Sequence, residues 1–140
     1  MTRHANIFAV LFSIADKEKQ EKILTNVLEN EKIPAITTPY FNFFELDVLC
    51  QMGKLQEVLD KIRSYWGGML DLGAVTFWEE YDPSVPKEEQ YDMYGDHFGK
   101  SLCHAWAASP IYFLAKYFAG LDLVNKDGVT YVLKPQMQYF

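Results

Sequence analysis

Apolar residues recur at helical spacing through the first half of the chain and predict four consecutive helices. The first, at residues 2–15, is apolar almost all round, and the second, at 16–29, carries its apolar residues on one face. The third, at 39–52, is again largely apolar, and the fourth, at 55–66, is again amphipathic. Helices buried on most sides thus alternate with helices that face water. This order is typical of the antiparallel hairpins of a doubly ringed α-toroid.

Capping residues indicate where these helices begin and end. Asp16 can accept backbone N–H bonds at the start of the second helix. Thr38 followed by Pro39 suits the start of the third, with Thr38 as N-cap and Pro39 as the first helical residue. Gly53 is well placed to end that helix, because glycine adopts left-handed backbone angles at little cost.

The second half of the chain is irregular before it becomes helical again. Residues 67–99 hold five glycines and two prolines and predict a long loop, which in a compact chain is usually functional or disordered. A last helix is predicted at 101–119, with a kink or restart at Pro110 and Ser109 as its cap, since the proline ring clashes with the preceding turn.

Strand character appears near the end of the chain. A turn at 126–128 precedes an apolar run at 129–133 that predicts a short strand. We therefore divide the chain into a helical part, residues 1–121, and residues 122–140, which would form the start of a C-terminal β domain or a tail.

Composition and charge exclude several classes of function. Hydrophobic residues make up 49% and charged residues 23% of the 140, as in an ordinary soluble globular protein. The net charge of −6 argues against nucleic acid, because binding phosphates requires clustered lysine and arginine. The apolar run at 5–12 is too short to cross a membrane, so no membrane partner is expected.

The segment at 73–82 holds the first candidate for chemistry. Glu79 follows Trp78 among several aromatic residues, near the start of the long loop. Such a setting partly desolvates a carboxylate and raises its proton affinity, as a general base or acid near neutral pH requires. The alternative is a surface glutamate beside a core tryptophan.

The histidines hold the second candidate. His97 and His104 lie seven residues apart with Cys103 beside the latter, a spacing that matches no familiar zinc pattern, so we expect no metal site and no cofactor. His104 is close to Trp106, and suits either a hydrogen-bonded structural residue or a donor to a polar ligand.

Four segments, taken in order, resemble the six-hairpin catalytic domain of bacterial α-L-rhamnosidases, glycoside hydrolase family 78. They are Thr37-Thr38-Pro39-Tyr40, Tyr65-Trp66-Gly67-Gly68-Met69, Gly73-Ala74-Val75-Thr76-Phe77-Trp78-Glu79 and Ser101-Leu102-Cys103-His104-Ala105-Trp106. The resemblance covers roughly residues 4–135. It implies an all-α chain that forms the last hairpins of an (α/α)6 toroid, with a short β strand at its C-terminus.

The resemblance also implies roles for four residues. By position, Glu79 matches the general base that activates water, and His104 matches a histidine that hydrogen-bonds the rhamnose hydroxyls. Trp78 and Trp106 would be supporting aromatic residues. The implied reaction is hydrolysis of terminal α-L-rhamnosyl residues with inversion of configuration. In the family the general acid lies on earlier helices, upstream of anything present here, so we expect very little activity from this chain alone.

Two other interpretations stay open. One is a non-catalytic carbohydrate-binding remnant, which would still recognise glycans or glycosides that contain L-rhamnose. The other is a structural remnant that associates with itself through an exposed apolar edge.

The resemblance to bacterial enzymes does not decide whether the protein lies in the cytoplasm or in the periplasm. The apolar run at 5–12 could be part of a secretory signal, but Asn6 within it and the weak basic start favour a packed helix.

Overall fold

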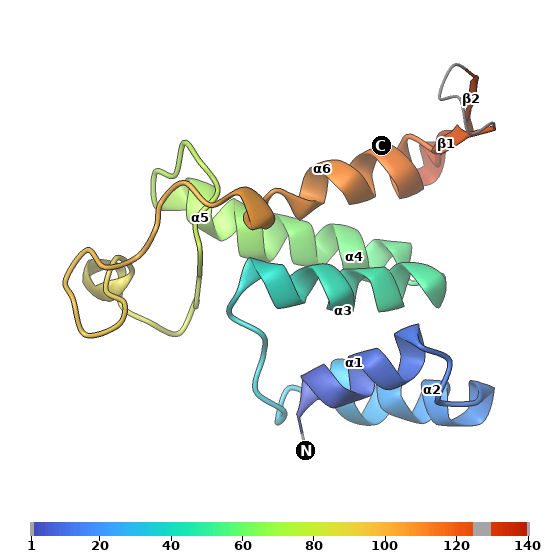
Figure 1. Cartoon of the computed structure of the whole chain (residues 1–140), viewed down its shortest axis with the longest axis horizontal. Coiled ribbons are helices and arrows are strands. Elements are labelled where there is room, and N and C mark those ends of the chain that lie inside the picture. Colours follow the sequence, from blue (N-terminus) through green and yellow to red (C-terminus); the bar gives the residue numbers. More distant parts are fainter. Residues whose placement is uncertain (1, 125–129, 140) are drawn as a thin grey trace.

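The computed structural model describes residues 2–124 and 130–139, and helices account for most of this part of the chain (Figure 1). The helical runs are α1 (Arg3–Leu11), α2 (Lys17–Ile23) with η1 (Leu24–Leu28), α3 (Pro39–Gln51), α4 (Leu55–Lys61) with η2 (Ile62–Trp66) and α5 (Gly67–Asp71), and α6 (Ser109–Phe113) with η5 (Leu114–Phe118). Short 3₁₀ turns lie at η3 (Lys87–Glu89), η4 (Ala105–Ala107) and η6 (Met137–Tyr139). Strands β1 (Leu121–Leu123) and β2 (Tyr131–Leu133) pair antiparallel. The predicted all-α chain with a short β element at its C-terminus is confirmed.

Local signals place several helix ends as predicted. The Asp16 carboxylate accepts a hydrogen bond from the backbone N–H of Lys19 at 3.0 Å. Pro39 stands in the first turn of α3, and Gly53 follows that helix with a φ of +75°. The helix restarts beside Pro110, as predicted. The turn expected at 126–128 and the first residue of the expected strand lie outside the described residues.

Other predicted helix ends are wrong. The fourth helical run continues through Gly67 and Gly68 to Asp71, where the buried Met69 anchors the extra turn in the core. Residues 101–108 are not an α-helix, and the last helix begins only at Ser109. Ser109 does not cap it, because its hydroxyl is buried and finds no hydrogen-bond partner within the described structure.

Helix α1 is buried on one side only. Ile7 and Val10 are in the core, but Phe12 and Ile14, just beyond the helix, are 70% and 75% exposed. The prediction of a first helix buried on most sides is therefore wrong, because no element of the described chain covers its outer face. The third helix fits its prediction better, since most of its apolar residues are buried or half-buried.

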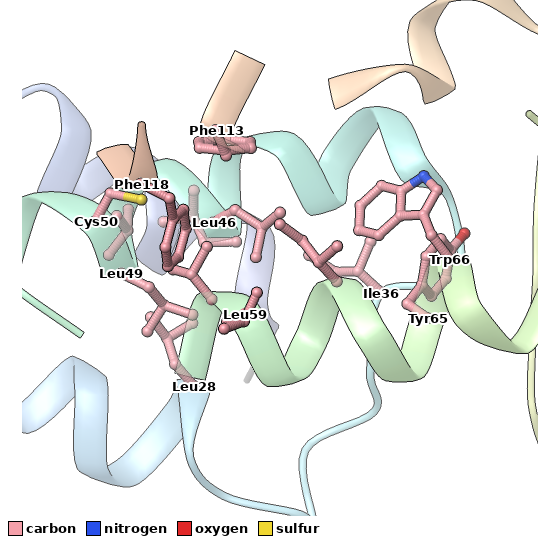
Figure 2. Close-up of a cluster of buried hydrophobic side chains, with 14 of the residues drawn as sticks. Leu28, Ile36, Leu46, Leu49, Cys50, Leu59, Tyr65, Trp66, Phe113 and Phe118 are labelled. Carbon is pink, nitrogen blue, oxygen red and sulfur yellow. The ribbon is translucent and has the colours of Figure 1, made fainter. Parts of the chain in front are cut away.

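The helices stack in layers around α3. In Figure 1, α1 and α2 lie on one side of α3 and α4, and α6 lies on the other. Side chains from all three layers meet in one core (Figure 2), where Leu28 of η1, Leu46 of α3 and Phe113 of α6 are buried. The long loop between α5 and α6 projects beyond one end of these layers and carries the candidate site (Figure 1).

An ion cluster lies inside this apolar packing. Arg3 Nη1 donates to Glu45 Oε1 at 2.9 Å and to the Leu28 carbonyl at 2.7 Å. The other guanidinium nitrogens donate to backbone carbonyls of the segment between η1 and α3. Lys61 Nζ also donates to Glu45 Oε1. Burial lowers the pKa of Lys61, and Glu45 opposes that shift. The cluster therefore joins α1, α3, α4 and the connecting segment at one point.

Stability should fall as the pH rises above about 9, because buried acids must ionise when the chain unfolds. Burial raises the pKa of the Cys50 thiol from 9.0 to about 12, and the pKa of the Tyr117 phenol from 10.0 to about 12. A raised pKa in the folded state contributes stability that is complete below the unfolded value and is lost between the two values. The urea midpoint measured from pH 8 to 11 should therefore decline.

Cys50→Ala should make that decline shallower, because it removes one of the acids whose pKa burial raises. Cys103→Ala is the matched control, since that thiol is exposed and should not alter the pH dependence. An unchanged slope in Cys50→Ala would contradict the prediction.

Candidate functional site

Backbone hydrogen bonds set two segments of the long loop side by side. The N–H of Glu79 donates to the carbonyl of Ser101 at 2.9 Å, and the N–H of His104 donates to the carbonyl of Phe77 at 2.8 Å. Residues more than twenty positions apart are thereby held in a fixed register. The predicted base and the predicted sugar-binding histidine belong to these two segments.

The carboxylate of Glu79 is held at both of its oxygens. Oε2 accepts from the backbone N–H of Ser101 at 3.1 Å, and Oε1 accepts from the hydroxyl of Tyr94 at 3.1 Å. The side chain is 15% exposed, so the group is sheltered but still accessible from one side. An ionised carboxylate accepts hydrogen bonds only, and each oxygen can accept more than one. Glu79 can therefore still receive a hydrogen bond, or a proton, from a water molecule.

His104 stands next to this carboxylate, and its Nδ1 is buried. Its Nδ1 lies 3.8 Å from Glu79 Oε2 and has no hydrogen-bond partner among the described residues. The imidazole packs against the indole of Trp106, with ring centres 4.1 Å apart. Trp106 is 53% exposed and also contacts Tyr40, at 5.6 Å between ring centres. The structure thus brings together Glu79, His104 and Trp106, and adds an aromatic surface beside the two polar groups.

Trp78 is placed differently from the other three predicted residues. It is 3% exposed and packs edge-to-face on Tyr91, with ring centres 5.5 Å apart. Both rings border a hollow of about 370 Å³ whose other walls include Val75, Phe98 and Leu102. Trp78 therefore supports the segment of Glu79 from the core side, while Trp106 presents the open aromatic face.

Tyr94 is a site residue that the sequence analysis missed. It is 81% exposed and stands in the tight turn Met93–Asp96, where Tyr94 and Gly95 both have positive φ angles, +55° and +85°. Two successive positive φ angles are characteristic of a type I′ turn, which is usually signalled by Asn-Gly or Asp-Gly rather than by Tyr-Gly. Nothing in the sequence pattern therefore indicated that this hydroxyl would reach Glu79.

A buried cation balances the acidic loop. Lys100 is 8% exposed, and burial lowers its pKa, while the nearby carboxylates of Glu80, Asp82 and Asp92 oppose that shift. Glu80 also accepts a hydrogen bond from the hydroxyl of Thr37 at 2.8 Å, which ties the loop to the start of α3. These contacts hold the base of the loop close to the helical layers.

Residues 2–124 and 130–139 contain neither a metal-binding cluster nor a membrane-spanning helix. No three or more histidine, cysteine, aspartate or glutamate side chains converge there in a way that could hold a metal ion. None of the helices in that part of the chain is long and apolar enough to cross a membrane.

Comparison with known proteins yields a likeness in structure and none in sequence. No protein-family model matches the chain, and no curated protein matches it in sequence. The structure superposes on the crystal structure of a GH78 family rhamnosidase of Bacillus sp. GL1, with a TM-score of 0.75 and 27% sequence identity. The likeness covers 96% of this chain but only 14% of that chain. The fold of this chain is therefore similar to one segment of a rhamnosidase, and the activity of a whole enzyme does not follow from it.

The hydrogen bond between Tyr94 and Glu79 can be tested without any substrate. Together with the negative charge of Glu79, it raises the pKa of the Tyr94 phenol. Glu79→Gln should therefore lower the Tyr94 pKa toward its ordinary value of about 10. The measurement is a titration of ¹³C-labelled tyrosine by NMR, with Tyr94→Phe used to assign the signal. Glu88→Gln, in the exposed η3 turn, should leave the titration unchanged. If the Tyr94 pKa is the same in Glu79→Gln as in the unchanged chain, the two groups do not interact in solution.

Proposed function

We propose that this chain carries the general base and part of the sugar site of an α-L-rhamnosidase. The observation that supports this most directly is the pairing of Glu79 with His104. Their side chains come from separate segments, lie 3.8 Å apart and are only 15% and 21% exposed. The likeness to a segment of a GH78 family rhamnosidase supports a glycoside hydrolase over other sugar-binding proteins.

In the proposed reaction Glu79 takes a proton from a water molecule while that water attacks the anomeric carbon of a terminal α-L-rhamnosyl group. The attack occurs on the face opposite the leaving oxygen, so configuration inverts. Ser101 and Tyr94 orient the carboxylate through their hydrogen bonds to its two oxygens. A proton donor to the leaving oxygen must come from outside the residues described above, so the chain alone is expected to bind the sugar but hardly to cleave the bond.

His104 would bind sugar hydroxyl groups through Nε2, because its Nδ1 is buried and faces the carboxylate of Glu79. The exposed indole of Trp106 would pack against the apolar face of the sugar ring, because an aromatic ring offers a flat apolar surface. Trp78 would hold the segment of Glu79 rigid from the core side.

The test is thermal unfolding of the purified chain at increasing concentrations of L-rhamnose. A ligand that binds only the folded state raises the midpoint with concentration. We expect a rise that His104→Ala abolishes and that His97→Ala leaves intact. His97 is a suitable control because it is 64% exposed and pairs with Asp92 instead of Glu79.

A midpoint that does not respond to L-rhamnose would argue against the proposal and favour a structural remnant. The carbohydrate-binding remnant would be favoured by two results together. The midpoint would still rise with L-rhamnose in Glu79→Gln, and Glu79 would contribute nothing to catalysis in a larger assembly.

A further inference from the structure

The chain exposes more surface than a compact protein of its size. Its accessible surface is 8884 Å². A compact monomer of 16.2 kDa is expected to expose roughly 7,500 Å². The difference, about 1,400 Å², exceeds the roughly 800 Å² that each partner contributes to a standard stable interface. The surplus is therefore large enough for one complete protein–protein contact.

Exposed apolar side chains gather over α6, η5 and the β1–β2 hairpin, and we call this the α6–β surface. In Figure 1, α6 and the two strands lie on the far side of α3 and α4 from α1 and α2. The exposed apolar residues of this surface are Ile111, Tyr112, Leu114, Leu121, Tyr131 and Leu133. A two-stranded hairpin is only marginally stable by itself in water, so a hairpin with exposed apolar side chains gains stability from a cover.

The centre of the α6–β surface is a hollow of about 480 Å³ with two charged residues on its wall. Lys116 comes from η5, and Asp122 comes from β1. Lys116 donates to the hydroxyl of Tyr112 at 2.8 Å, and its ammonium lies over the rings of Tyr112 and Tyr117, contacts that hold it in place. Neither Lys116 nor Asp122 forms an ion pair within residues 2–124 and 130–139.

We propose that two copies of this chain associate through the α6–β surface about a twofold axis, so that Lys116 of each copy faces Asp122 of the other. A twofold contact brings the same patch of both copies together, so the patch must be complementary to itself. An apolar centre with one cation and one anion meets that requirement, because each copy offers the charge that the other lacks. The association is independent of the proposed activity, since Glu79 and His104 lie in the long loop.

The first measurement is sedimentation equilibrium of the whole chain over a range of concentrations. We expect a dimer. Ile111→Asp should weaken association roughly ten- to a hundredfold, because it places a charge in the apolar centre of the contact. Phe12→Asp is the matched control, since Phe12 is also strongly exposed but directly follows α1. Helix α1 lies on the opposite side of α3 and α4 from α6 (Figure 1). Circular dichroism of both variants checks that they fold.

The charge pairing is tested by exchange. Lys116→Asp alone and Asp122→Lys alone should each weaken association, because each variant brings like charges together across the axis. An equimolar mixture of the two variants should recover association, because every facing pair in the mixed dimer is then of opposite sign.

The proposal is overturned by any of three results: a wild-type chain that stays monomeric, a dimer lost in Phe12→Asp but kept in Ile111→Asp, or no recovery on mixing. A monomeric wild-type chain would mean that helices of another polypeptide are the natural cover of this surface.

Discussion

Exchange of Glu79 for glutamine should lower rhamnosidase activity by about 10²–10⁴-fold, the usual contribution of a general acid or base. Because this chain spans only 14% of the Bacillus sp. GL1 rhamnosidase, the measurement requires a chimera in which the chain replaces the segment that it resembles. Glutamine keeps the length of the side chain and one oxygen that can accept from Ser101 or Tyr94. It cannot take a proton from water, so the loss would report the chemical role.

The division of the effect between kcat and KM distinguishes catalysis from binding. Loss of a base that acts in the transition state lowers kcat and leaves KM nearly unchanged. Loss of a ligand to the sugar raises KM, which is the result expected for His104→Ala in the same chimera. Hydrolysis of an aryl α-L-rhamnoside gives both constants.

Glu80→Gln is the matched control for Glu79→Gln. The two glutamates are neighbours in sequence, but the Glu80 carboxylate accepts from the hydroxyl of Thr37 at the start of α3. Its replacement should therefore leave kcat within a small factor of the parent chimera. Equal losses in the two variants would indicate damage to the loop and would contradict the role given to Glu79.

Helix positions were largely predictable because periodic apolar residues report which face of a segment is buried. The last helix shows where that signal ends. Residues 101–108 are rich in helix-compatible residues, yet the carbonyl of Ser101 pairs with Glu79 and the N–H of His104 pairs with Phe77. In a helix those backbone groups would form hydrogen bonds within the helix. Residues 101–108 are therefore not helical because their backbone pairs with a distant segment instead.

The site shows the same division between local and distant information. Trp78-Glu79 is a local pattern and could be singled out from sequence, as could His104 beside Trp106. The contact of Tyr94 with Glu79 joins positions 15 apart through an unusual turn, and no local pattern predicts it.

The burial of Arg3 is a third example of distant information. Its partner Glu45 is 42 positions away, so its burial depends on how α1 packs on α3 and not on its neighbours in sequence. A first helix that is apolar almost all round gives no local sign that it buries an arginine.

Glu45→Gln should destabilise the chain by about 3–5 kcal/mol, the cost of breaking a buried ion pair from one side. The Glu45 side chain is 2% exposed and is the counter-charge for both Arg3 and Lys61. Glutamine preserves the volume, so no cavity forms, but the buried guanidinium of Arg3 and the partly exposed ammonium of Lys61 then lose their shared anion. Urea unfolding followed by circular dichroism measures the loss.

Two companion variants separate the charge effect from other causes. Glu18→Gln removes an exposed partner of Lys22, whose ion pair is 2.6 Å long, and should leave the urea midpoint unchanged because solvent screens surface pairs. Adding Lys61→Met to Glu45→Gln removes one of the two uncompensated cations and should recover part of the lost stability. If the double variant is no more stable than Glu45→Gln, the cost does not arise from the unpaired cations, and the cluster does not stabilise the packing of α1 on α3 in the way that its hydrogen bonds indicate.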